Sequence, residues 1–364
     1  MGGKSLDTQM RQVLELFAQP AFFARDGVVL WCNGAARGLL TEGTPIASLL
    51  ENNTALFSHW SREGTLQIPL IIGGVEYDAS VRATQDGDLF VASRRSQELN
   101  ATAAAVVSAS VSLRKPLHMM LSAAGALFEQ LEGTAEHTSV PASQLNRSIY
   151  QLVRLCGQMS DGGQLLLHRK EVHREPTDLV KFLSDFVAQA QPLIESTGIH
   201  LAYTPPDVPI RGDVDRTLLE RALYNLISNA MNYTPRGGTI TLSAERQDRL
   251  LLLSVSDTGE GIEQSVMSTL FDRFCTSAPG DSRRGLGLGL PMVREIARLH
   301  GGTMMVDANA DGGTSVTFSV SLEKTPLELR SRTVLYDYCG DLNHALVELS
   351  DVLDADMFNP VDIQ

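Results

Sequence analysis

Short apolar runs separated by turn residues fill the first part of the chain. The dipeptide Asp26-Gly27 divides two such runs, FFAR and VVLWC, and this arrangement is typical of a β-hairpin. Three further strand-like runs follow, TLQIPLII, VEYDASVRAT and LFVAS, with glycines between them. The pattern predicts a small α+β domain over residues 1–93: a strand pair, small helices and a three-strand meander.

The pattern then changes to a helical period. Two helical runs are predicted at 94–131 and 142–163, and the second repeats apolar residues at steps of three and four: Leu145, Ile149, Leu152, Val153 and Cys156. Two helices joined by one loop bury little apolar surface alone. We therefore expect 94–165 to be a helical hairpin that dimerises into a four-helix bundle.

Helices and strands alternate from residue 174 to 322, which predicts an α/β sandwich. Its first helix is expected to begin after Thr177 as the N-cap. The remaining residues, 323–364, contain one amphipathic helix near DLNHALVELSDVL. We expect this helix to pack back on the sandwich, because its apolar stripe would otherwise be exposed.

Composition narrows the possible functions. The 364 residues are 43% hydrophobic and carry a net charge of −13, which argues against nucleic acid as the main partner. The four cysteines are scattered singly, so neither a cysteine-ligated metal site nor a disulfide framework is expected. No apolar run approaches the roughly 18 residues that a membrane helix needs. These features predict a cytoplasmic chain without a membrane segment.

Three short motifs within the sandwich bear polar or glycine residues suited to a phosphate ligand. Asn225 and Asn229 are four residues apart on one predicted helix, and amide oxygens are suitable ligands for Mg²⁺. Asp257 ends a strand and opens DTGEGI, while the glycines of RRGLGLGLP precede a helix, where backbone amides can bind anions. Each motif alone has an ordinary explanation, a hydrogen-bonded core pair or a turn. Together, in this order, they indicate a nucleotide site.

These motifs, with LFDRF and ARLHGG, resemble the successive N, G1, F and G2 boxes of the ATP-binding domain of sensor histidine kinases. That fold is shared with gyrase, MutL and the heat-shock chaperone ATPases, and the resemblance covers roughly 174–322. The helical pair resembles the family's dimerisation and phosphoacceptor domain, and 13–93 resembles a PAS sensor domain. The implied architecture is a multidomain α+β protein.

The resemblance implies a site for ATP and Mg²⁺. Asp257 would accept a hydrogen bond from the adenine amino group, with Gly259 and Gly261 letting the ring approach, while Asn229 with Asn225 would hold the metal. The other implied nucleotide contacts are Tyr233, Ile262, Arg284, Gly285, Gly287, Leu288, Gly289 and Leu290. The family usually has Lys or Arg where this chain has Asn232, and Arg284 is placed to compensate.

The acceptor helix keeps the family's Leu-Arg-x-Pro-Leu frame but not its reactive residues. Val111 occupies the histidine position, Ser112 that of the neighbouring acid, and Lys115 that of the threonine used in dephosphorylation. Valine has no lone pair and cannot attack phosphorus. His118 is an alternative acceptor about two helical turns away, and Ser110 or Ser112 lacks an activating base.

Three functions stay open at this level. The first is a homodimeric two-component protein, a pseudokinase, that binds Mg-ATP and regulates a response regulator or partner kinase, or phosphorylates a partner. The second is an autokinase using His118, Ser110 or Ser112. The third is a dimeric scaffold without catalysis.

Overall fold

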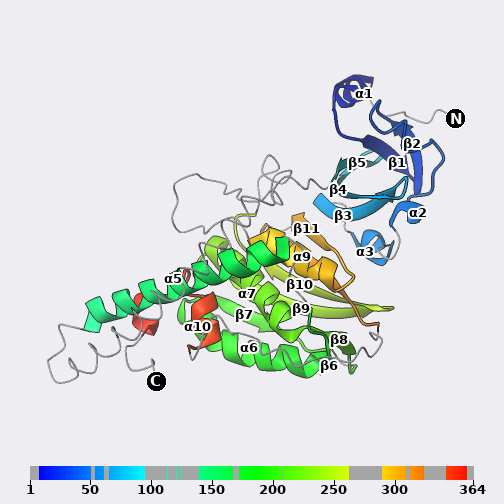
Figure 1. The fold of residues 1–364 in the computed structure, drawn as a ribbon. Coiled ribbons are helices and arrows are strands. Elements are labelled where there is room, and N and C mark those ends of the chain that lie inside the picture. Colours follow the sequence, from blue (N-terminus) through cyan, green and yellow to red (C-terminus); the bar gives the residue numbers. More distant parts are fainter. Residues whose placement is uncertain are drawn as a thin grey trace.

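The computed structural model describes residues 8–50, 54–60, 65–94, 113, 120, 124, 139–166, 172–206, 208–261, 289–308, 312–323 and 342–358. Figure 1 shows the N-terminal domain at one end, a sheet with helices over one face, and the long helix α5 lying across that helical layer.

The N-terminal domain is an antiparallel sheet of order β2-β1-β5-β4-β3 with small helices. The predicted hairpin is confirmed: Asp26 and Gly27 adopt φ values of 51° and 74°, which the tight turn requires. In the core, the Phe22 and Phe90 rings stack with centroids 4.7 Å apart. The elements are α1 (Thr8–Glu15), β1 (Ala21–Arg25), β2 (Val28–Cys32), α2 (Ala47–Leu50), α3 (Thr54–His59), β3 (Thr65–Ile72), β4 (Val75–Thr84) and β5 (Gly87–Arg94).

The second part follows the predicted alternation of helix and strand. Two strands that the sequence analysis did not predict, β6 and β8, form a separate two-stranded sheet. The elements are β6 (Glu175–Asp178), α6 (Leu179–Ser196), β7 (His200–Tyr203), β8 (Arg211–Val214), α7 (Arg216–Tyr233), β9 (Thr239–Gln247), β10 (Leu250–Asp257), α9 (Gly289–Leu299), β11 (Met304–Ala308) and β12 (Thr314–Ser321).

The predicted cap of helix α6 was wrong by one residue. Asp178 is the N-cap, and its carboxylate accepts a hydrogen bond from the Lys181 amide. Thr177 lies in β6, where its hydroxyl donates to the Glu175 carbonyl. The strand pairing of β6 with β8 holds Thr177 in extended backbone, which leaves the next residue to begin the helix.

Strand β10 is buried on both faces, which explains its nearly continuous leucines. Leu251, Leu253 and Val255 pack into the core shared with α6, α7 and α9. Leu250 and Leu252 point the other way and share a core with the N-terminal domain. The sandwich therefore has helices on one face and the N-terminal domain against part of the other.

The sheet of the N-terminal domain and the main sheet of the sandwich join into a single ten-stranded sheet. Strand β3 pairs antiparallel with β11, with Leu66 opposite Met305. An ion pair between Asp78 of β4 and Arg294 of α9 adds a second connection. The N-terminal domain thus contacts the sandwich directly, a contact that no local sequence pattern indicated.

Helix α5 (Ser139–Leu166) includes the predicted run 142–163. Ile149, Val153 and Cys156 of the predicted stripe are buried, but Leu145 and Leu152 remain 45% and 40% exposed. The predicted start of the partner helix, 94–131, was wrong by one residue, because Arg94 ends strand β5. The rest of that helix lies outside the described residues except at three single positions, and the helical hairpin stays a prediction.

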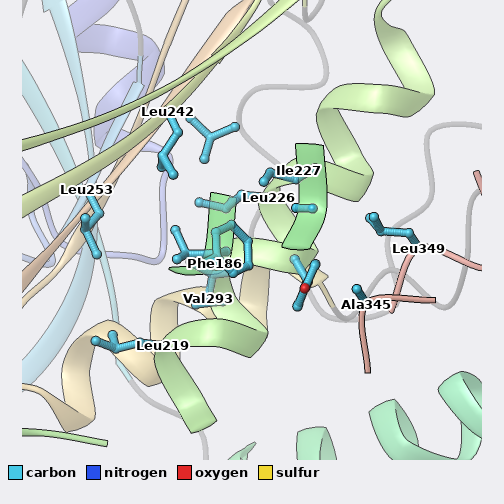
Figure 2. Packing of buried hydrophobic residues seen from close by; sticks show 14 of the residues in the cluster. Phe186, Leu219, Leu226, Ile227, Leu242, Leu253, Val293, Ala345 and Leu349 are labelled. Atoms are coloured by element: carbon cyan, nitrogen blue, oxygen red, sulfur yellow. The ribbon is translucent and has the colours of Figure 1, made fainter. Parts of the chain in front are cut away.

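The C-terminal segment 342–358, here called the strap, packs back on the sandwich as expected. Its helix is shorter than predicted: α10 (His344–Glu348) is little more than one turn, followed by the 3-10 turn η3 (Ala355–Met357). Figure 2 shows Ala345 and Leu349 of the strap at the edge of the apolar cluster that contains Leu226 and Ile227 of α7. The strap also contacts α5, so it lies between α5, α6 and α7 (Figure 1).

A buried carboxylate of the strap is the centre of an ion network. Glu348 is fully buried and lies 3.7 Å from Arg154 Nε and 3.6 Å from Arg221 Nε. His344 Nε2 lies 3.8 Å from the same carboxylate, and Asp351 also pairs with Arg154. Because Arg154 belongs to α5 and Arg221 to α7, the network connects the strap to both helices.

The network makes stability depend on pH through His344. Burial alone would lower the pKa of His344, but its hydrogen bond to Glu220 and the charges of Glu348 and Glu220 outweigh burial and the opposing Arg221, so the pKa is raised. A group whose pKa is higher in the folded state stabilises that state when it is protonated. This stabilisation is complete below the unfolded-state pKa of about 6.5, and it is lost as the pH rises through the folded-state pKa. We expect His344→Gln to destabilise more at pH 6 than at pH 8.5 in urea unfolding; equal effects at both pH values would contradict this.

Candidate nucleotide site

Helix α7 places two asparagines side by side near its C-terminal half. Asp215 caps the helix by accepting from the Leu218 amide, which fixes where the helix begins. Asn225 is buried, and its amide donates to the Arg221 carbonyl at 2.8 Å. Asn229 follows one turn later and is half-buried.

Gly289, at the start of α9, lies against both asparagines. A Cβ at this position would lie 3.3 Å from Asn225 Oδ1, 3.5 Å from Asn229 Nδ2 and 3.8 Å from Asn229 Oδ1. The last glycine of the glycine run therefore lies against the asparagine pair. Two amide oxygens over a residue without a side chain suit a hard cation such as Mg²⁺.

Asp257 ends β10 with its carboxylate buried. Its Oδ1 accepts hydrogen bonds from the Gly259 amide at 2.9 Å and from the Thr314 amide at 3.3 Å. Burial raises the pKa of Asp257, and these two hydrogen bonds partly oppose the shift. The two amides thus fix the orientation of the carboxylate through Oδ1, and a carboxylate is a suitable acceptor for an amino group.

Close backbone approaches hold this loop in place. A Cβ at Gly259 would lie 2.4 Å from the Tyr233 carbonyl, and one at Gly313 would lie 2.0 Å from the Asp257 carbonyl. Both glycines are therefore required for packing, and Gly259 brings the Asp257 loop against the end of α7. Gly261, with φ of 75°, has the left-handed conformation that favours glycine.

Gly313 and its neighbours were not predicted as part of the site. Gly312 and Gly313 have φ values of 90° and 86°, and the Thr314 amide contacts Asp257. The signal was present as a glycine pair before the last strand, but nothing in the sequence placed that turn beside Asp257.

Asn232 and Tyr233 lie at the exposed end of α7. The Asn232 amide donates back to the Ser228 carbonyl at 3.0 Å, so this side chain is hydrogen-bonded to its own helix. Tyr233 is 40% exposed. Leu290 follows Gly289 in the first turn of α9 and is half-buried.

The remaining expected residues lie outside the described part of the chain. They are Ile262, Arg284, Gly285, Gly287 and Leu288 of the nucleotide site, and Ser110, Val111, Ser112, Lys115 and His118 of the acceptor helix. Their assignments stay predictions.

Comparison with known proteins identifies the domain that contains these residues. Residues 214–324 match the family model of the histidine kinase-, DNA gyrase B- and HSP90-like ATPases. This range contains Asn225, Asn229, Asp257 and Gly289. This part of the chain is an ATPase domain of the family that includes the histidine kinases.

Individual sensor histidine kinases are similar to about 60% of this chain. Histidine protein kinase DivJ of Caulobacter vibrioides is 28% identical over 217 residues, 59% of this chain and 36% of DivJ. Sensor histidine kinase WalK of Bacillus subtilis is 28% identical over 222 residues, again 59% and 36%. Sensor protein DivL of C. vibrioides is 33% identical over 233 residues, 60% of this chain and 28% of DivL.

The match covers about a third of the length of these relatives. Among solved structures, full-length ShkA in complex with AMPPNP is 24% identical, with a TM-score of 0.49 over 61% of this chain and 47% of ShkA.

Within the described residues of this histidine kinase homologue, no helix combines the length and apolar character needed to cross a membrane.

Proposed function

We propose that this chain binds Mg-ATP between α7, the Asp257 loop and the start of α9, and works as a nucleotide-gated protein of two-component signalling. The observation that carries the proposal is the buried Asp257 carboxylate, oriented by two backbone amides beside the asparagine helix. Asp257 would accept from the adenine amino group, and Asn229 with Asn225 would hold Mg²⁺, which bridges and neutralises the phosphates.

The glycine run supplies the other side of this site. Gly285, Gly287 and Gly289 would donate backbone amides to the phosphates at the positive end of α9. Arg284 would supply the charge that Asn232 lacks. Gly289 supports this arrangement through its position against both asparagines.

Phosphoryl transfer to the family's usual position is excluded in this proposal, because Val111 has no nucleophilic atom. The chain would regulate a response regulator or a partner kinase through its nucleotide state, or transfer phosphate to a partner. Its N-terminal domain would be PAS-like and its helical hairpin would dimerise. The exposed Leu145 and Leu152 on α5 support an additional helical partner.

Two measurements on the purified chain test the proposal. Mg-ATP at a hundred times its dissociation constant is expected to stabilise the folded state by about 2.7 kcal/mol, seen as a raised melting temperature. With γ-labelled ATP, no label on the chain itself is expected. A GTP control at the same concentration should stabilise less, because its purine presents an oxo group where adenine presents an amino group.

Other outcomes point to other functions. Acid-labile label that disappears in His118→Ala would identify an autokinase, and acid-stable label would point to Ser110 or Ser112. Absence of any nucleotide-dependent stabilisation would contradict the proposal and leave the scaffold function.

A further inference from the structure

Side chains of helix α5 hold the strap largely through hydrogen bonds to the backbone carbonyls of the strap. Arg147 donates from Nε to the Ser350 carbonyl at 3.2 Å and from Nη2 to the Asp351 carbonyl at 3.1 Å. Gln151 Nε2 also donates to the Ser350 carbonyl, at 3.2 Å. The path of the strap is therefore fixed at these two carbonyls.

The far end of the strap is held against the same helix. The Asn146 amide donates to the Phe358 carbonyl at 3.2 Å, and the Tyr150 ring meets the Phe358 ring edge-on at 5.1 Å. Both aromatic rings are almost fully buried. The strap thus follows α5 along more than two turns, from Asn146 to Arg154.

The other side of the strap contacts α7. His344 Nδ1 lies 3.2 Å from Glu220 Oε1, and the His344 ring packs edge-on against Tyr224 at 5.7 Å. Glu348 pairs with Arg221. Helix α5 adds a direct contact, because Arg154 Nη2 donates to Ser228 Oγ at 2.9 Å.

These contacts fall on the stripe of α7 that carries the candidate metal ligand. Arg221, Asn225 and Ser228 are spaced by four and three residues, so they lie on one face. The Asn225 amide is hydrogen-bonded to the Arg221 carbonyl, and Ser228 immediately precedes Asn229. A change in the position of either asparagine is therefore passed to residues that the strap and α5 contact.

We propose that the strap, residues 342–358, couples the nucleotide site to helix α5. Nucleotide binding fixes the asparagine face of α7, the strap connects that face to α5, and α5 is stabilised in turn. The inference rests on the nucleotide binding proposed above. The coupling is reciprocal: whatever holds α5 also raises nucleotide affinity.

Hydrogen exchange of the full chain, with and without Mg-AMPPNP, tests this coupling. We expect the nucleotide to slow exchange in peptides of β10 and α9, and to slow exchange of α5 by at least about five-fold, the lower range of typical coupling. The double variant Arg147→Ala/Asp351→Asn removes the Arg147 hydrogen bonds to the strap and the Arg154–Asp351 ion pair, so it weakens the hold of α5 on the strap. It should keep the slowed exchange of β10 and α9 and reduce that of α5.

A matched control lies on the same segment. Asp354 pairs with Arg236 at 3.3 Å, but both side chains are exposed, at 63% and 79%. Asp354→Asn should therefore behave as the wild type. These point variants are preferable to removal of the strap, whose apolar residues belong to the main core.

The failures are distinguishable. Slowed exchange at β10 and α9 without any change in wild-type α5 would overturn the coupling and leave nucleotide binding intact. Slowed α5 exchange that is undiminished in the double variant would overturn the role of the strap. No change anywhere would overturn both the nucleotide site and the coupling.

Discussion

Glu348→Ala is expected to lower the free energy of unfolding by about 3–5 kcal/mol, the usual effect of removing one partner from a buried ion pair. Glu348 is fully buried between Arg154 and Arg221, whose side chains are only 5% and 4% exposed. Without the carboxylate, Arg221 loses the ion pair that balances its charge there. Arg154 would retain its pairing with Asp351.

The measurement is urea unfolding followed by far-UV circular dichroism. Tryptophan fluorescence is unsuitable, because the two tryptophans, Trp31 and Trp60, both lie in the N-terminal domain. Glu348→Gln should be nearly as destabilising as Glu348→Ala, since the amide keeps the volume but not the charge. Asp354→Asn should change stability by less than about 1 kcal/mol, as exposed pairs do. A Glu348→Ala variant within that range would show that the network contributes little.

The parts of this protein that the sequence predicted are those determined by near neighbours in the chain. The Asp26-Gly27 hairpin and the asparagine face of α7 each follow from local conformation or a helical period. The positions of Gly259 and Gly289 were predicted only through the family resemblance, since their neighbours in space are distant in sequence.

The parts that it missed are set by contacts between distant segments. Asp178 replaced Thr177 as a cap because β6 pairs with β8, and the Gly312-Gly313 turn reached the site through the β11–β12 hairpin. The strap was expected to cover the sandwich, yet its link to α5 depends on Arg147 and Arg154, whose spacing resembles that of any solvated helix face. The sequence alone does not show whether an arginine at such a spacing on a helix is exposed or buried against another segment.

Asp257→Asn is expected to weaken ATP binding roughly ten- to a hundred-fold. A hydrogen bond to a charged group contributes about 1.5–3 kcal/mol, and each 1.4 kcal/mol is a factor of ten in affinity. The substitution keeps an oxygen that can still accept from the Gly259 and Thr314 amides, so the loop should keep its shape. The other position becomes an NH₂ donor, which cannot accept from the adenine amino group.

Purine selectivity distinguishes loss of recognition from loss of folding. An asparagine donor suits the 6-oxo group of guanine or hypoxanthine, so Asp257→Asn should shift the ratio of ATP to ITP affinity toward ITP, which lacks the adenine amino group but keeps the triphosphate. Asp248→Asn, at the exposed turn before β10, is the matched control and should leave both affinities unchanged. If Asp257→Asn weakened ATP and ITP equally, Asp257 would act by shaping the loop rather than by reading the base. If neither affinity changed, the adenine would bind elsewhere.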